Sequence, residues 1–224
     1  MTFYRQFVRG ACVTTSARAA EMVKLVENSY RDVNIAFANE LSFICDKQGI
    51  NVWELIRLAN LHPRVNVLRP GPGVGGHCIA VDPWFIVDGA PDDARLIRAS
   101  REINDAKPDF VVRKVKQRAS ELRQPVIACL GLAYKADVDD LRESPAVEVV
   151  RKLSESNLGN ILVVEPHVNK LPHELDRPNL QLSDFEVAVK SANLIVLLVA
   201  HRAFMHVDRD MLKDKFVIDT VGAW

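Results

Sequence analysis

The sequence predicts an all-helical domain followed by a doubly wound α/β domain. Two observations support this fold class. Residues 17–47 carry apolar side chains at three- and four-residue steps, which is the pattern of one long amphipathic helix. From about residue 107 onward, short apolar runs alternate with helical patterns, which indicates βαβ units around a parallel sheet. We therefore assign residues 1–106 to the helical domain and residues 107–224 to the α/β domain.

The long helix at residues 17–47 is the strongest single element. At 1.5 Å per residue it would be about 45 Å long. That length exceeds the core of a small domain, so we expect the helix to pack against a second copy of the chain as well. Gly49 stands where a C-terminal cap is expected, and Asn51 can cap a shorter helix at residues 52–60. The apolar stripe of the long helix consists of Ala19, Met22, Val23, Val26, Tyr30, Val33, Phe37, Leu41 and Ile44.

The rest of the helical domain has a mixed pattern. Residues 64–89 are rich in glycine and proline, which predicts loop and turns. A helical pattern resumes at residues 91–106, is interrupted at Pro108 and then continues to about residue 122.

The strands of the α/β domain are predicted from short runs that are apolar without alternation. Such runs are typical of parallel strands buried on both faces. The expected strands are residues 126–130, 161–164, 194–199 and 216–219, with helices at 146–156 and 184–191.

Charge and composition restrict the classes of partner. The chain has 29 basic and 29 acidic residues, and this balance argues against nucleic acid or an anionic membrane as the main partner. The N-terminus lacks a signal-peptide pattern, and the longest apolar run, residues 194–200, is too short to span a bilayer. The four cysteines form no C-x-x-C pair. We therefore expect a reduced, cytoplasmic protein.

The stretch PGPGVGGHCIAVDPWF, residues 70–85, is the first candidate site. Gly71, Gly73 and Gly75 permit close approach of the backbone to a ligand, and successive N–H groups in such a loop can bind an anion. The alternative is a tight connection between helices. The stretch is not a dinucleotide fingerprint, because no strand precedes it and no helix clearly follows it.

Cys78 lies within this stretch. A lone cysteine is more often an inert buried residue than a nucleophile, but Cys78 lies outside any apolar stripe and among many backbone N–H groups. His77 and Asp82 are close in sequence. These three adjacent ligand types match no zinc spacing, so we expect no metal site.

Two polar groups of the long helix form a second candidate site. Lys24 and Asn28 are four residues apart and lie opposite the apolar stripe. They form either a solvated helix face or a cation and an amide directed at a developing oxyanion.

A third candidate site follows the first predicted strand, in GLAYKADVDDLRESP. Ligands of open α/β sheets bind beyond the carboxyl ends of the strands. Lys135 and Arg142 supply two cations there, and Ser144 and Pro145 can start the next helix. The segment is either a phosphate- or nucleotide-binding loop or an ordinary βα connection.

Three segments, taken in order, resemble a known enzyme family. AEMVKLVENSYRDVNIAFANEL, GPGVGGHCIAVDP and GLAYKADVDDLRESP are similar to segments of the nucleotide-sugar 6-dehydrogenases, which include the UDP-glucose and GDP-mannose dehydrogenases. The resemblance covers nearly the whole chain. The form HPRVNVLRPGPGVGGHCIAVDPWFIV is most similar to the UDP-N-acetyl-D-mannosamine dehydrogenases of bacterial surface-polysaccharide synthesis. Val81 stands where UDP-glucose enzymes usually have lysine, which favours an N-acetylhexosamine substrate.

The resemblance implies a reaction and its catalytic residues. The reaction would be an NAD-dependent, four-electron oxidation of the sugar C6 alcohol to a carboxylate. Cys78 would capture the intermediate aldehyde as a thiohemiacetal, and the thioester that follows would be hydrolysed. Lys24 and Asn28 would stabilise the oxyanion, and Asp82 would act with the water or with the lysine.

The resemblance also implies binding roles. In the Rossmann-like second domain, Tyr134 and Lys135 would contact the uridine diphosphate. The nicotinamide would lie near Cys78 and Val81, and Arg142 would also reach NAD. Arg64 would reach across the interface of a homodimer formed through the long helix. The sugar and diphosphate would be lined by Arg69, Gly71, Gly73 and Gly75.

One departure from the family pattern is large. The family's N-terminal Rossmann domain with G-x-G-x-x-G, which binds NAD, has no counterpart in this sequence. We therefore expect the chain to be the C-terminal half of such an enzyme and to be inactive alone. Three alternatives stay open: UDP-N-acetylglucosamine as substrate, a non-catalytic dimer that binds a UDP-sugar, and a thiol hydrolase that uses Cys78 and His77.

Overall fold

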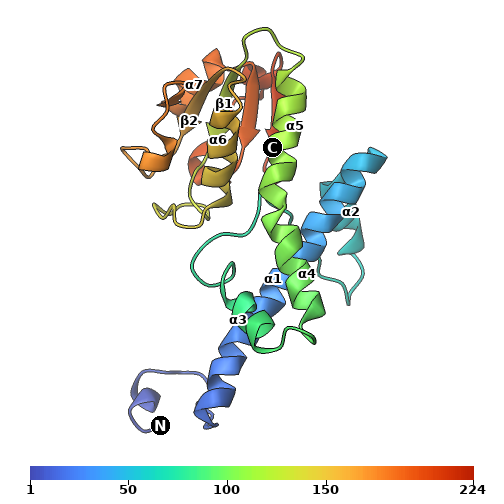
Figure 1. Ribbon diagram of the computed structural model, residues 1–224, viewed down its shortest axis with the longest axis vertical. Helices are drawn as coiled ribbons and strands as arrows, with labels where there is room; N and C mark the ends of the chain where they lie inside the picture. Colours follow the sequence, from blue (N-terminus) through green and yellow to red (C-terminus); the bar gives the residue numbers. More distant parts are fainter.

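The computed structural model describes residues 1–224 and shows a helical half followed by a parallel sheet with helices (Figure 1). The two halves are joined by α5, which continues almost directly from α4. The helical half comprises the short 3-10 turn Tyr4–Gln6 and the helices α1 (Ala17–Gln48), α2 (Val52–Ala59), α3 (Asp82–Gly89), α4 (Arg95–Asp105) and α5 (Lys107–Ala119). None of these helices combines the length and the apolar character that a bilayer crossing requires.

The predicted ends of α1 and the start of α2 are confirmed. Ser16 accepts the N–H of Ala19 at the start of α1, and Gly49 ends the helix in the left-handed conformation at φ 67°. The side chain of Asn51 accepts the N–H groups of Trp53 and Glu54. Local capping chemistry therefore fixes these boundaries.

Burial on α1 is the reverse of what its hydrophobic pattern suggests. The buried residues are mostly small or polar: Asn28, Ser29, Asp32, Ala36, Ala38, Asn39, Ser42 and Cys45. Most of the apolar stripe is exposed, with Met22, Val23, Val26, Tyr30, Phe37 and Ile44 at 45–72% exposure. The polar face packs inside because Asn39 and Asp32 find hydrogen-bond partners on α4, and Asn28 finds one on α3.

The prediction that residues 64–89 contain only loop and turns is wrong. Residues 82–89 form α3, which begins with Asp82 and Pro83. Proline suits the first turn of a helix, where its missing N–H has no partner to lose. The dense glycines and prolines before residue 82 concealed this short helix. Two helix ends also differ from the prediction. Residues 91–94 form a turn, so α4 begins at Arg95 and not at residue 91, and α5 ends at Ala119 and not near residue 122.

The second half is a five-stranded sheet with all pairs parallel, in the order β3-β2-β1-β4-β5. The four predicted strands are present. A fifth strand was missed because its three residues are too short to show a pattern. The elements are β1 (Val126–Leu130), α6 (Pro145–Glu155), β2 (Asn160–Val164), β3 (Leu180–Leu182), α7 (Phe185–Ser191), β4 (Leu194–Leu197) and β5 (Phe216–Asp219).

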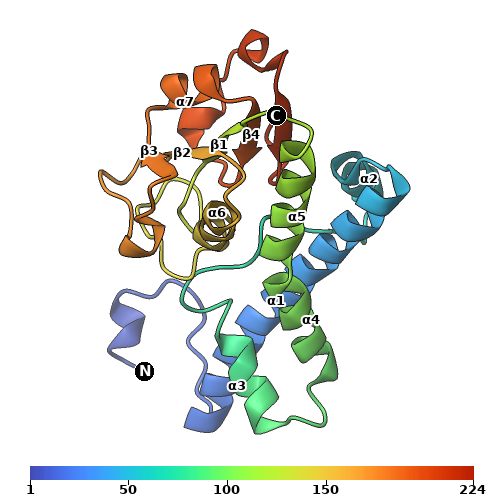
Figure 2. The same cartoon turned by 45° about the horizontal axis from the view of Figure 1, so that its top comes forward.

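Helices cover both faces of this sheet (Figure 2). On one face, α5 and α6 pack their apolar residues on β1 and β4, and on the other face α7 packs with Phe204. The strand register places Leu130 beside Val164 and Leu197. The loops that follow β1, β2 and β4 therefore meet at one edge of the sheet, as the expected nucleotide site requires.

Candidate functional site

Cys78 lies at the surface, in the turn that precedes α3. Its carbonyl oxygen accepts the N–H of Val81 at 3.1 Å and that of Asp82 at 2.7 Å. The thiol thus lies one turn before the N-terminus of α3. Exposure leaves it open to reaction.

Asn28 and Asp82 join α1 to α3 beside this turn. The Nδ2 group of Asn28 donates to Oδ2 of Asp82 at 2.5 Å. Asn28 is only 8% exposed, so it is not part of a solvated helix face. The structure therefore brings three predicted catalytic residues, Cys78, Asn28 and Asp82, into one region.

Lys24 lies one helical turn before Asn28 on α1 and is exposed. Its Nζ is 3.5 Å from Glu27 Oε2, and both side chains are more than 60% exposed. Such a surface ion pair contributes little and leaves the ammonium free to reorient. No contact joins Lys24 to Cys78 or Asp82.

The glycines of residues 71–76 mainly permit contact with the loop after β1. A Cβ added to Gly75 would lie 2.3 Å from the carbonyl oxygen of Glu143, and one on Gly73 would lie 2.7 Å from Pro145. Gly76, at φ 87°, lies against the ring of Tyr134. These glycines allow the segment that carries Cys78 to pack against the second domain. Neither of the two hypotheses from the sequence, an anion-binding loop or a tight connection between helices, included this contact. At Gly71 an added Cβ would meet only the carbonyl oxygen of Gly73, at 3.8 Å, and the N–H of Gly71 is donated to Oδ1 of Asn39.

The remaining predicted arginines of the helical half, Arg64 and Arg69, are exposed. Neither side chain makes a hydrogen bond or ion pair within the chain. Their positions on the connection between α2 and α3 leave them available to a ligand or to another subunit.

In the loop after β1, the side chain of Lys135 is exposed, whereas the side chain of Arg142 forms an ion pair with Asp140. The guanidinium of Arg142 bonds both oxygens of Asp140, at 2.9 and 2.8 Å. These bonds hold the pKa of Asp140 well below its usual range. Asp140 also accepts from Nε2 of His77 at 3.2 Å. His77 is therefore oriented toward Asp140, which argues against a Cys78–His77 hydrolase pair.

Two residues that sequence reasoning missed, Glu165 and His201, hold the backbone of the loop after β1 through hydrogen bonds. Oε2 of Glu165 accepts the N–H of Leu132 at 2.7 Å and that of Ala133 at 3.0 Å. Nε2 of His201 lies 3.0 Å from the same oxygen. Burial pushes the pKa of Glu165 upward, but the hydrogen bonds from His201 and Leu132 outweigh it and leave that pKa below its usual value. The available sequence signal was that Glu165 comes directly after the predicted strand 161–164 and His201 comes two residues after the predicted strand 194–199.

This arrangement does not suit a dinucleotide at the end of β1. Gly131, at φ 93°, permits the approach of Val199, because an added Cβ would lie 2.4 Å from the Cβ of that residue. The first N–H groups of the loop bond Glu165 and cannot receive a diphosphate. A nucleotide here would depend on Tyr134 and Lys135 instead.

The cluster of Asp137, His167 and His201 has ligand atoms within 4.8 Å of one another. However, His201 uses both ring nitrogens, since Nδ1 accepts the N–H of Asp137 at 2.9 Å and Nε2 bonds Glu165. Two ligands would remain, which is fewer than a structural or catalytic zinc site uses. We assign no metal to this cluster.

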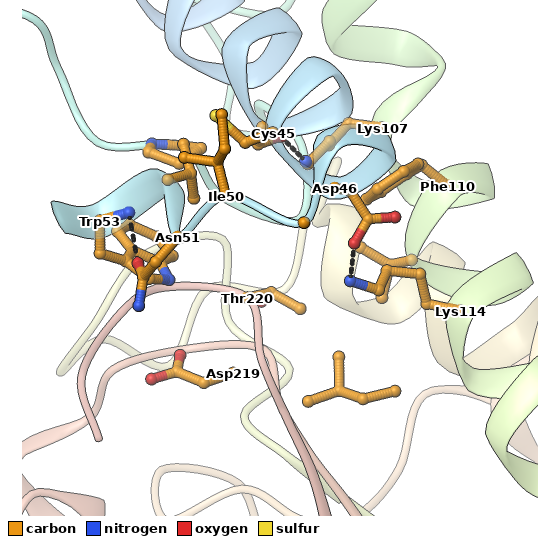
Figure 3. A pocket seen from close by; sticks show the side chains of 16 residues that line it. Cys45, Asp46, Ile50, Asn51, Trp53, Lys107, Phe110, Lys114, Asp219 and Thr220 are labelled. Atoms are coloured by element: carbon orange, nitrogen blue, oxygen red, sulfur yellow. Dashed lines mark hydrogen bonds and ion pairs between the residues drawn. The ribbon is translucent and has the colours of Figure 1, made fainter. Parts of the chain in front are cut away.

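A cavity of about 430 Å³ lies between the C-terminal end of α1, α2, α5 and the end of β5 (Figure 3). Lys107, Trp53 and Thr220 contribute to its wall. Ser42, the first α1 residue of the lining, is about 20 Å farther along the helix than Asn28, at 1.5 Å per residue. The cavity is therefore separate from the Cys78 region.

Comparison with known proteins identifies the family. Residues 18–106 match the central domain of the UDP-glucose/GDP-mannose dehydrogenase family, and residues 128–224 match its UDP binding domain. The chain belongs to this family. An NDP-N-acetyl-D-galactosaminuronic acid dehydrogenase of Ralstonia solanacearum is 61% identical over 99% of this chain, and a UDP-N-acetyl-D-mannosamine dehydrogenase of Campylobacter jejuni is 57% identical over 92%.

Solved structures of family members have the same fold. The UDP-N-acetyl-mannosamine dehydrogenase Cap5O from Staphylococcus aureus is 43% identical over 99% of this chain, with a TM-score of 0.84. A UDP-N-acetyl-mannosamine (UDP-D-ManNAc) dehydrogenase from Pyrococcus horikoshii is 36% identical over the full chain, with a TM-score of 0.85. The chain spans about half the length of the relatives it matches, 51–53% in these four cases.

Proposed function

We propose that the chain is the substrate-binding half of an NAD-dependent UDP-N-acetyl-D-mannosamine 6-dehydrogenase of surface-polysaccharide synthesis. The observation that carries the proposal is the exposed thiol of Cys78, one turn before α3, with Asp82 of that helix held by Asn28. Membership of the dehydrogenase family supports the reaction class.

The chemistry assigned to the chain begins with the sugar C6 aldehyde, which is two electrons more oxidised than the alcohol. The sulfur of Cys78 adds to the aldehyde carbon and forms a thiohemiacetal. Lys24 and Asn28 stabilise the oxygen while it is negative. Loss of a second hydride gives a thioester, and water then releases the carboxylate and restores the thiol. In this proposal Asp82 takes the proton of that water.

NAD supplies the hydride acceptor for both oxidation steps. This chain offers it only surface groups, namely Cys78, Val81 and Arg142, all of which are exposed. The loop after β1 does not form a dinucleotide-binding loop, because the N–H groups of Leu132 and Ala133 donate to Glu165. The proposal therefore places the main cofactor site outside these 224 residues, and the chain alone is expected to be inactive.

The substrate class is a UDP-N-acetylhexosamine. Val81, where UDP-glucose enzymes usually have lysine, is 39% exposed and adds no cation to the site. The relatives at 53–57% identity named as UDP-N-acetyl-D-mannosamine dehydrogenases favour that sugar. The relatives at 60–61% named for N-acetyl-D-galactosaminuronic acid make an N-acetylgalactosamine nucleotide the second candidate.

The proposed assembly is a homodimer through the exposed apolar stripe of α1. Six large apolar side chains of this stripe are 45–72% exposed, which is unusual for one face of a helix without a partner. The proposed compartment is the cytoplasm, because four free cysteines suit a reducing environment.

The test is a panel of UDP-sugars with NAD, in which NADH formation is followed. The 224-residue chain is compared with the same chain fused to the other half of a family member. We expect turnover only in the fusion, greatest with UDP-N-acetylmannosamine and abolished by Cys78→Ser. Turnover by the chain alone, or a fusion that binds UDP-sugars without turnover, would contradict the proposal. The second outcome would favour a non-catalytic binding module.

A further inference from the structure

Asn39 lies in the middle of α1 and is fully buried. Its Oδ1 accepts the backbone N–H of Gly71 at 2.9 Å, and its Nδ2 donates to Oδ1 of Asn104 at 2.9 Å. One amide thus ties the beginning of the glycine-rich segment to the helix that carries Lys24 and Asn28.

The hydrogen bonds from Gly71 through Asn39 and Asn104 run in one direction and end at the carboxylate of Asp32. Nδ2 of Asn104 donates to the Asp32 carboxylate at 2.8 Å, and Asp32 also accepts from Arg101 at 2.6 Å. A backbone N–H can only donate and an ionised carboxylate can only accept, so both amide orientations are fixed by their neighbours. All four residues of this chain of hydrogen bonds are at most 1% exposed.

The segment from Gly71 to Asp82 is therefore held at both ends by amides of one helix. Asn39 holds Gly71, and Asn28 holds Asp82. The two amides are eleven residues apart on α1, which corresponds to about 16 Å along its axis. Cys78 lies between the two anchors, much closer to the Asp82 end.

We propose that Asn39 is a positioning residue for the nucleotide sugar. The inference rests on the proposed function, in which the Gly71 end of the segment lines the sugar and diphosphate. Asn39 acts through Gly71 and does not touch the reacting atoms. Because Cys78 is anchored separately through Asp82, loss of Asn39 weakens substrate binding and leaves the chemical step largely intact.

The direct test compares Asn39→Leu with Asn39→Asp in the 224-residue chain, with UDP-N-acetylmannosamine binding measured by calorimetry. Leucine removes the acceptor and leaves the N–H of Gly71 without a partner, so we expect Kd to rise about tenfold or more. Aspartate, held as the neutral acid by burial, can accept from the N–H of Gly71 and donate its O–H to Oδ1 of Asn104, so we expect Kd to stay within about threefold of wild type. In the fusion enzyme, Asn39→Leu should raise KM far more than it lowers kcat.

A matched control separates positioning from general loss of stability. Asn179 donates its amide to the carbonyl of Ser154 at 2.9 Å, on the far side of the second domain. Asn179→Leu should lower the thermal midpoint without changing Kd. If Asn39→Leu also lowers only the midpoint, Asn39 is merely structural and the proposal is overturned.

Hydrogen exchange of the wild-type chain keeps the proposal testable if Asn39→Leu does not fold. The Gly71 amide should be protected in the wild type and in Asn39→Asp, and rapid exchange in the folded wild type would overturn the anchor. A wild-type chain that binds no nucleotide sugar would overturn the proposed function. The exchange of Gly71 would still decide whether Asn39 anchors the segment.

Discussion

Asp82 is the residue through which the thiol segment is joined to α1. Its carboxylate accepts the amide of Asn28, and its N–H is donated to the carbonyl of Cys78. Asp82 therefore has a structural role, through these two hydrogen bonds, and a proposed chemical role, through its carboxylate. A substitution that keeps the hydrogen bonds but removes the negative charge tests the two roles separately.

Asp82→Asn is expected to lower kcat with little loss of stability. The asparagine oxygen can still accept from Asn28, whereas the variant cannot take a proton from water. Loss of general base catalysis costs about 10²–10⁴-fold in rate. In the fusion enzyme, turnover should fall by about that factor while the thermal midpoint changes by only a few degrees. Unchanged turnover would remove Asp82 from the proposed mechanism.

Long-range contacts explain why sequence reasoning proposed Cys78, Asn28 and Asp82 as site residues but did not single out Glu165 and His201. The first three lie in motifs that can be recognised as short segments. Glu165 and His201 come from different strand ends, 36 residues apart, and meet only because β2 and β4 both flank β1. The roles of Asn39 and Asn104 were hidden for the same reason, since these two hydrogen-bonded residues are 65 positions apart in the sequence.

At the scale of elements, hydrophobic periodicity located α1 but could not say which face would be covered. The pattern shows that one face is apolar, whereas the structure buries the opposite, polar face against α4. Caps at Gly49 and Asn51 are local, and so they were predictable. The start of α3 was not, because the prolines and glycines before it are equally typical of a loop.

The contact between the glycine-rich segment and the loop after β1 gives an element-scale prediction about stability. In Gly75→Ala, the new Cβ would lie 2.3 Å from a backbone oxygen, so the segment must move. We expect a loss of about 1–3 kcal/mol in the free energy of unfolding. Gly71→Ala is the matched control, because its Cβ would meet only one atom, at 3.8 Å. Denaturant unfolding measures both, and equal stability of the two variants would contradict the close contact.

Lys107, at the start of α5, gives a second prediction at this scale. Its Nζ lies 4.6 Å from the ring centroids of both Phe43 and Phe110 and bonds Ser42, and no carboxylate pairs with it. Burial, reinforced by Lys114, lowers the pKa of Lys107 to about 7. Its value in the unfolded chain is about 10.4.

The sign of the pH dependence follows from these two values. Below about pH 7 both states bind the proton, and the folded state bears the full cost of the buried charge. Above pH 7 only the unfolded state keeps the proton, so the stability of the wild type rises with pH until about 10. Relative to Lys107→Met, the wild type should therefore gain up to about 1.4 kcal/mol per pH unit between pH 7 and 10. A difference that is independent of pH would mean that Lys107 stays charged between its two aromatic rings.

At the scale of the whole molecule, α5 connects the two halves and shares in both. Its apolar residues Val111, Val112 and Val115 belong to the core of the sheet, while Lys107 and Lys114 face α1. The glycine-rich segment makes a second connection between the halves. The boundary at residues 106 and 107 separates the helical pattern of the sequence from its alternating strand and helix pattern. The candidate site nevertheless depends on contacts between the two halves, made by the glycine-rich segment and the loop after β1.

The arrangement of these halves leaves the apolar stripe of α1 outside both cores. Val26 in the middle of that stripe is 51% exposed. If two copies of the chain associate through this face, a charge there would have to be buried without a partner, which is strongly unfavourable. Val26→Glu is therefore expected to dissociate the dimer, as measured by sedimentation at micromolar concentration.

Val187 provides the matched control for this prediction. It is 53% exposed on α7, on the far side of the sheet, so Val187→Glu places the same charge at an equally exposed valine. We expect Val187→Glu to remain dimeric and Val26→Glu to be monomeric, with similar thermal midpoints for the folded monomer because neither side chain supports the core. A wild-type chain that sediments as a monomer, or a Val26→Glu variant that stays dimeric, would show that α1 does not form the interface.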